Sequence, residues 1–160
     1  GTDPRLPDFT AVPCPGHFPT LRSLAFHDAG GRRVWIVGDA VLGEEWLRAW
    51  EYYWPNGYGP TEIAQTWRSV ATILSGADVV IPGHGPPIAV TAQLLEDLLA
   101  RFPGAEHAPD CPDVAEAIRR RLESLGAGPG RERPGPTPPP PEDPASPQLP
   151  GYLPRTGPGV

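Results

Sequence analysis

The sequence predicts a mixed α/β domain over residues 1–125 followed by a disordered tail over residues 126–160. Two patterns indicate the α/β class: short apolar runs typical of strands, and longer segments in which apolar residues recur every three or four positions, as on one face of a helix. A third observation separates the tail, because residues 126–160 hold 12 of the 25 Pro and 7 of the 19 Gly. Such a segment has too few apolar side chains to offset the entropy lost on folding.

The first predicted elements form a β-hairpin. Residues 1–15 are rich in Pro and polar residues, and we expect a loop there. The apolar runs at residues 21–26 and 34–37 flank Gly30-Gly31, a pair that tolerates the positive φ angles of a tight turn. Every residue of the second run is apolar, which predicts a strand buried on both faces inside a layered domain.

The rest of the domain is predicted to contain helices and one further strand. We expect helices over residues 44–53, 60–76, 90–102 and 112–125, because each has an apolar face and ends near Gly or Pro. The apolar run at residues 77–81 is too short for a helix, so we expect a strand that leads into a Gly-rich and Pro-rich loop.

Charge and composition exclude several functional classes. The formal net charge is −6, which argues against nucleic acid or an anionic membrane as a partner. No run of 18 apolar residues occurs, so no membrane span is predicted. Cys14 and Cys111 are too few for a disulfide scaffold, and we expect a cytoplasmic protein. Because the sequence contains no Met and begins at Gly1, we expect further residues upstream.

Three residues carry reactive side chains, and two of them, Asp39 and His84, stand where functional sites usually form. His17 stands at the entrance to a predicted strand, Asp39 follows the strand at 34–37, and His84 lies in the loop after the strand at 77–81. Sites in layered α/β proteins gather beyond the carboxyl ends of strands, and imidazole and carboxylate groups are ligands for Zn²⁺ and Fe²⁺. Each residue taken alone also has an ordinary interpretation, as a surface or core histidine or as an aspartate that caps a helix or forms a turn.

Three segments resemble the last three metal motifs of the metallo-β-lactamase superfamily of hydrolases. They are Pro15-Gly16-His17, Val37-Gly38-Asp39-Ala40-Val41 and Val79-Val80-Ile81-Pro82-Gly83-His84-Gly85-Pro86. The resemblance covers about residues 12–102 and corresponds to the C-terminal half of that fold, an αββα sandwich. It implies that His17 ligates one metal, Asp39 bridges two and His84 ligates the other, with two Zn²⁺ ions expected and iron or manganese as alternatives.

The resemblance also implies a function, that of a metal-dependent hydrolase. In such an enzyme, metal-bound hydroxide attacks an ester, thioester, lactone or similar bond of a small-molecule substrate. The superfamily's first motif, His-x-His-x-Asp-His, does not occur in this sequence, and Phe18-Pro19-Thr20 stands where members commonly have Thr-Pro-Gly. We therefore expect an incomplete hydrolase that lacks the N-terminal half of the fold and binds metal poorly alone.

Two other functions stay open at this point. The missing motif, the aromatic stretch at residues 46–58 and the Pro-rich tail favour a non-catalytic remnant or an interaction module. Alternatively, His17, Asp39 and His84 would hold a single iron in an oxygenase of the same fold.

The other reactive or charged residues have simpler interpretations. His27 and His107 are interpreted as solvated surface residues, and Cys14 as a small side chain packed beside a loop. The aromatic residues at 46–58 are suited to a substrate-lining wall, a core or an interface. The arginines at 119–121 are expected on the solvated face of a helix.

Overall fold

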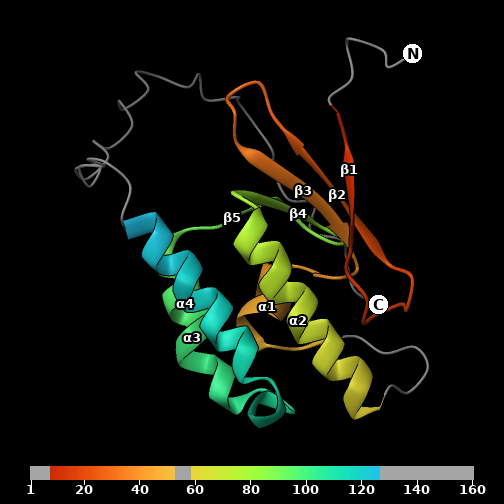
Figure 1. Ribbon diagram of the computed structural model, residues 1–160, viewed down its shortest axis with the longest axis vertical. Coiled ribbons are helices and arrows are strands. Elements are labelled where there is room, and N and C mark those ends of the chain that lie inside the picture. Colours follow the sequence, from red (N-terminus) through yellow and green to blue (C-terminus); the bar gives the residue numbers. More distant parts are fainter. Residues whose placement is uncertain (1–7, 53–58, 127–160) are drawn as a thin grey trace, which may run out of the picture. The chain divides into compact units, whose positions relative to one another are not determined.

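A five-stranded sheet and four α-helices make up residues 8–52 and 59–126, the part of the chain that the computed structural model describes (Figure 1). The strands are β1 (Thr10–Pro13), β2 (Arg22–His27), β3 (Arg33–Gly38), β4 (Val79–Pro82) and β5 (Ile88–Ala89). The helices are α1 (Glu44–Ala49), α2 (Pro60–Gly76), α3 (Ala92–Arg101) and α4 (Pro112–Gly126), and two 3₁₀ helices, η1 (Phe102–Gly104) and η2 (Ala108–Asp110), join the last two. The protein is therefore of mixed α/β class, as predicted, whereas residues 127–160 of the predicted tail lie outside the described residues.

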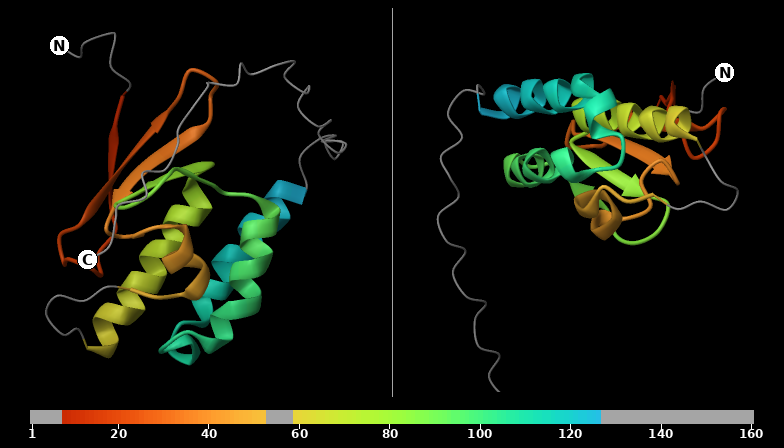
Figure 2. Two further views of the ribbon diagram at one scale, coloured as in Figure 1. Left: turned by 180° about the vertical axis from the view of Figure 1, so that it is seen from behind. Right: turned by 90° about the horizontal axis from the view of Figure 1, so that it is seen from below.

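The strands follow one another across the sheet in the order β1-β2-β3-β4-β5. Neighbours pair antiparallel except β3 and β4, which run parallel and pair Val34 with Val79 and Gly38 with Pro82. The predicted hairpin is confirmed as β2 and β3, with Gly31 at a φ of +78° in its turn. Parallel neighbours need a long crossover connection, and here that connection contains α1 and α2 (Figure 2).

The two faces of the sheet differ in burial. The strand side chains that join the helices in the buried core are Trp35, Val37, Val80 and Ile88. On the opposite face Leu24 is 41% exposed and Ile36 is 38% exposed. Because successive strand residues point to opposite faces, the prediction that residues 34–37 are buried on both faces is wrong at Ile36.

The helix predictions are confirmed for α2, α3 and α4, with small shifts of their ends. Helix α3 begins at Ala92 because Thr91 caps it, its Oγ1 accepting a hydrogen bond from the Leu94 N–H at 3.1 Å. Helix α1 ends at Ala49, earlier than predicted, because Trp50 takes a left-handed conformation with a φ of 52°. Residue 53, the predicted end, lies outside the described residues.

Two strands were not predicted from the sequence. Strand β1 lies within the segment expected to be a loop, and it pairs through Thr10–Pro13 with β2. Strand β5 is only two residues long and pairs with β4. Both are short pairings at the edges of the sheet, and a short edge strand carries little periodic signal.

An ion cluster joins α4 to the sheet at Asp78, directly before β4. Arg33 reaches Asp78 Oδ1 through Nη2 at 3.0 Å, and Arg121 reaches the same oxygen at 2.7 Å. The hydrogen bonds from Arg33, above all, hold the pKa of Asp78 well below its usual range. Arg119 and Arg120 are exposed as predicted, but the Arg121 side chain is only 9% exposed, so its expected place on a solvated face is wrong.

Replacing Asp78 with Asn should lower the free energy of unfolding at neutral pH by about 2 kcal/mol, because it leaves the Arg121 guanidinium without its counter-charge. Since the folded-state pKa of Asp78 is lowered, its stabilisation is complete above the unfolded carboxyl pKa of about 4 and declines as the pH falls below it. Urea unfolding at pH 7 and at pH 3 tests this. The difference between parent and variant should be smaller at pH 3, and an equal difference at both values contradicts the assignment.

Candidate functional site

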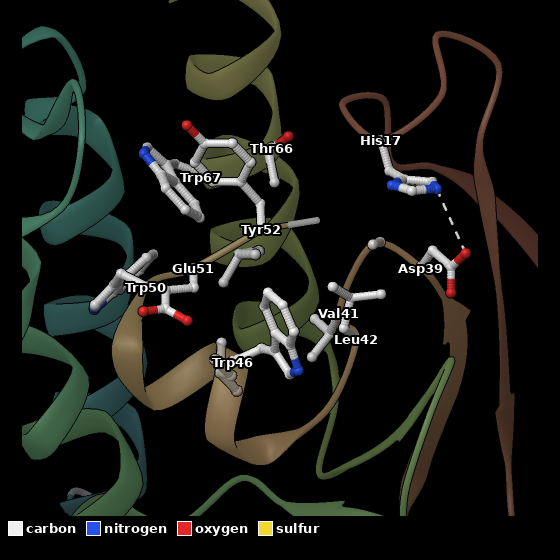
Figure 3. A pocket seen from close by; sticks show the side chains of 13 residues that line it. His17, Asp39, Val41, Leu42, Trp46, Trp50, Glu51, Tyr52, Thr66 and Trp67 are labelled. Carbon is white, nitrogen blue, oxygen red and sulfur yellow. Dashed lines mark ion pairs between the residues drawn. The ribbon is translucent and has the colours of Figure 1, made fainter. Parts of the chain in front are cut away.

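His17, Asp39 and His84 come together around the carboxylate of Asp39. The Nε2 atom of His17 lies 3.4 Å from Asp39 Oδ2, and the Nε2 atom of His84 lies 3.4 Å from Asp39 Oδ1. Figure 3 shows the first of these contacts at the edge of a pocket. The side chain of His17 is 17% exposed and that of His84 is 75% exposed, so the group faces solvent on the His84 side.

The parallel pairing of β3 and β4 places Asp39 beside the loop of His84. Both strands end at the same edge of the sheet, where Gly38 pairs with Pro82. The register between the strands shifts between Ile36 and Gly38, and an irregularity of this kind re-aims the residues that follow it. Asp39 directly follows this shift and meets a histidine on each side.

Backbone hydrogen bonds fasten the His84 loop to the segment after Asp39. The N–H of Gly83 donates to the Val41 carbonyl at 3.0 Å, and the N–H of His84 donates to the Leu42 carbonyl at 2.8 Å. The two segments approach so closely that a Cβ on Gly83 would lie 2.2 Å from Asp39 Oδ1. Glycine is therefore required at position 83 for the carboxylate to occupy its place.

Helix α2 holds the loop that carries His17. The Ser69 hydroxyl donates to the Pro15 carbonyl at 2.6 Å. Gly16 has a φ of +147° and packs against Thr66 so tightly that a Cβ there would lie 2.4 Å from the threonine Oγ1. His17 is thus positioned by packing on a core helix as well as by the β1–β2 connection, which the Cys14 N–H closes by donating to the Leu21 carbonyl at 2.9 Å.

The three side chains form two pairs that share Asp39. Within residues 8–52 and 59–126, no set of three His, Cys, Asp or Glu side chains is arranged to hold a metal ion together. Each imidazole instead faces its own carboxylate oxygen, at a distance longer than that of a good hydrogen bond. Each oxygen of the Asp39 carboxylate therefore has one imidazole nitrogen beside it.

The other candidate residues lie apart from this group. Cys14 is buried, and its sulfur accepts a hydrogen bond from the Ser23 hydroxyl at 3.1 Å, in agreement with a packing role. Burial raises the pKa of the Cys14 thiol, which keeps it protonated and unreactive. His27 ends β2 and is exposed, while His107 contacts Asp110 at 3.2 Å.

A pocket opens beside His17 and Asp39, and we call it the aromatic slot. Its aromatic wall consists of Trp46, Trp50, Tyr52 and Trp67. Figure 3 places His17 and Asp39 on one side of the slot and these aromatic side chains on the other. The aromatic stretch was expected to suit a substrate wall, a core or an interface. Trp50 belongs to the buried core and also lines the slot, while residues 53–58 lie outside the described residues. Helix α2 also lines the slot, through Thr66, Trp67 and Val70. The sequence did not predict this, because the spacing of these residues indicates only that they face the core.

The comparisons with known proteins add no relative to this description. No family model matches the chain, and no match was found among curated proteins or among solved structures. Among the described residues, none of the helices has the length and apolar character needed to cross a membrane.

Replacing Gly83 with Ala should displace Asp39 and lower the free energy of unfolding by about 1–3 kcal/mol, because the added methyl overlaps both the carboxylate and the Gly38 backbone. Denaturant unfolding measures the stability, and the NMR signals of the His17 and His84 rings report the displacement. Gly104→Ala is the matched control, since a Cβ at Gly104 meets nothing within 4 Å. Equal effects of the two substitutions contradict the close approach at Gly83.

Proposed function

We propose that this chain supplies the C-terminal half of a metal-dependent hydrolase of the metallo-β-lactamase superfamily. In this proposal His17 and Asp39 hold one metal ion, His84 and Asp39 hold a second, and residues from another part of the polypeptide complete both. The observation that carries the proposal is the placement of one imidazole against each oxygen of a single carboxylate.

The distances support a pair of metal sites. Ligand atoms bound tetrahedrally to zinc at about 2.1 Å lie about 3.4 Å from each other. Each Nε2 atom lies 3.4 Å from its Asp39 oxygen, which is that separation. Two bound cations at such a site supply a water molecule of lowered pKa and polarise a carbonyl or phosphoryl oxygen. The chain's own residues orient the group: Gly83 leaves room for the carboxylate, and α2 fixes the His17 loop.

The uncovered face of the sheet supports the proposal that a further layer belongs against it. Strand registers place two apolar rows there, Ala11-Leu24-Ile36-Ile81 and Phe26-Val34-Val79-Ala89, in which Leu24 and Ile36 are exposed and Val34 is buried. The Phe9 ring, 47% exposed, packs edge-on against Phe26 at a centroid distance of 5.1 Å. A sheet that is apolar on both faces is typical of a buried layer. A second sheet from the missing half of an αββα sandwich fits this face.

The two alternative functions, a mononuclear iron oxygenase and an interaction module, require different features of the structure. A single iron needs all three side chains on one ion, and the pairwise arrangement gives that function less support. An interaction module needs only the uncovered apolar face. The coding sequence upstream of Gly1 discriminates between the hydrolase and the module: an in-frame His-x-His-x-Asp-His favours the hydrolase, and its absence favours the module.

Calorimetric titration of the 160-residue chain with Zn²⁺ alone tests whether His17, Asp39 and His84 are metal ligands. We expect weak binding, because each ion would have only two ligands from this chain. Replacing either His17 or His84 with Ala should weaken binding by at least about 10-fold. His27→Ala is the control, since His27 is exposed and far from Asp39 in the sheet, and it should bind zinc like the parent.

Each outcome of the titration bears on the proposal. Stoichiometric, tight binding of two Zn²⁺ ions would contradict the view that half of the site is missing. Binding that survives the loss of both His17 and His84 would remove these residues as ligands. Elemental analysis of the metal retained by the purified chain separates zinc from iron and manganese.

The apolar sheet face should bind the dye ANS, which fluoresces on exposed apolar surfaces. The double variant Leu24→Ser and Ile36→Ser should lower this fluorescence by at least about twofold, because both side chains lie in the centre of the face. Phe18→Ser is the control, since Phe18 is 62% exposed but lies in the loop before β2. If the double variant binds as much dye as the parent, the face is not an open apolar surface, and this support for a second layer is lost.

A further inference from the structure

The aromatic slot beside His17 and Asp39 is small. Its cavity volume is about 20 Å³, which is room for about one water molecule or an equally slender group. Its entrance contains His17 and Asp39, and its far wall is formed by α1, the residues that follow it and α2 (Figure 3). A substrate held at Asp39 would therefore direct one thin substituent into the slot.

The walls of the slot offer contacts to apolar groups and few hydrogen bonds. The indole N–H groups of Trp50 and Trp67 donate to the carbonyls of Leu98 and Glu106, at 2.9 and 2.7 Å. The Thr66 hydroxyl donates to a carbonyl of its own helix at 2.9 Å. These donors are already engaged, so apart from the His17 imidazole and the Trp46 indole N–H the slot presents mainly ring surface and the aliphatic side chains of Val41, Leu42, Leu47 and Val70.

The charges of the slot oppose a negatively charged occupant. Among the described residues that line it, the carboxylates are Asp39 and Glu51, and there is neither Arg nor Lys. An anion placed among the rings would lose its hydration and meet no arginine or lysine side chain among the described lining residues. Transfer of an apolar group from water into the slot is favourable, because its apolar surface is removed from water.

We propose that the slot is the specificity pocket for a short, unbranched, uncharged aliphatic substituent next to the bond that is hydrolysed, an inference that rests on the proposed function. Trp46 limits the size of this substituent. It is the most exposed aromatic side chain in the described wall, at 38%, whereas Trp50 and Trp67 are 4% and 2% exposed and fixed by the hydrogen bonds above. The substrate class is accordingly esters or thioesters of short straight-chain acids.

Binding of simple esters, observed through the tryptophan indole N–H signals of the ¹⁵N-labelled 160-residue chain, tests this without catalysis. tert-Butyl acetate should shift the Trp46 and Trp67 signals in a saturable manner. Butyrate, which is charged, and tert-butyl trimethylacetate, which is branched on both sides of the ester bond, should bind at least about 10-fold more weakly, the discrimination expected of a tight apolar pocket. Trp46→Ala should restore binding of the branched ester, while Leu24→Ala, a similarly exposed residue on the opposite sheet face, should change nothing.

The outcomes separate the slot from the metal site. If tert-butyl acetate leaves the indole signals unmoved, or if butyrate shifts them equally, the slot proposal is overturned even when Zn²⁺ binds through His17 and His84. If the ester binds as expected but Zn²⁺ does not bind, the hydrolase proposal fails and the slot remains a binding site for short apolar groups. If Trp46→Ala prefers the straight-chain ester over the branched ester as strongly as the parent does, then Trp46 is not the residue that limits the size of the substituent.

Discussion

The parallel pairing of β3 with β4 is the contact on which the candidate site depends. It brings the ends of two strands, and with them Asp39 and His84, to the same edge of the sheet. An antiparallel pairing would have placed them at opposite ends. The crossover that parallel strands require supplies α1 and α2, which form the walls of the aromatic slot. One pairing therefore creates both the polar group and the apolar space beside it.

The fold could be predicted where periodicity is strong and local. The apolar spacing of α2, α3 and α4 defines the helices, and Gly30-Gly31 marks the hairpin. Strands β1 and β5 could not be predicted, because they are defined by pairing with a neighbour and not by their own pattern. Arg121 shows the same limit, since its burial depends on Asp78, which lies 43 positions earlier in the chain. Sequence spacing shows which face of a helix a residue occupies, but not what covers that face.

The candidate site was predictable in its members but not in its arrangement. Strand-end positions single out Asp39 and His84, and the resemblance of Pro15-Gly16-His17 to a hydrolase motif adds His17. Their division into two pairs depends on the register shift before Gly38, which re-aims Asp39, and on the close approach of Gly83. Neither has a local sequence signature. The resemblance to hydrolase motifs suggests a bridging carboxylate, and the two contacts of 3.4 Å are the physical form that such a bridge would need.

The two pairs at Asp39 depend on different parts of the fold. His84 is held by backbone hydrogen bonds to residues 41 and 42, a rigid connection within the β3–β4 edge. His17 is held by the packing of its loop on α2, through Ser69 and through the contact of Gly16 with Thr66. Helix α2 also carries Trp67 and Val70 of the slot wall. A movement of α2 would therefore displace His17 and reshape the slot together while leaving the His84–Asp39 pair in place. Under the proposed function, substrate fit would then be coupled to only one of the two metal-binding pairs.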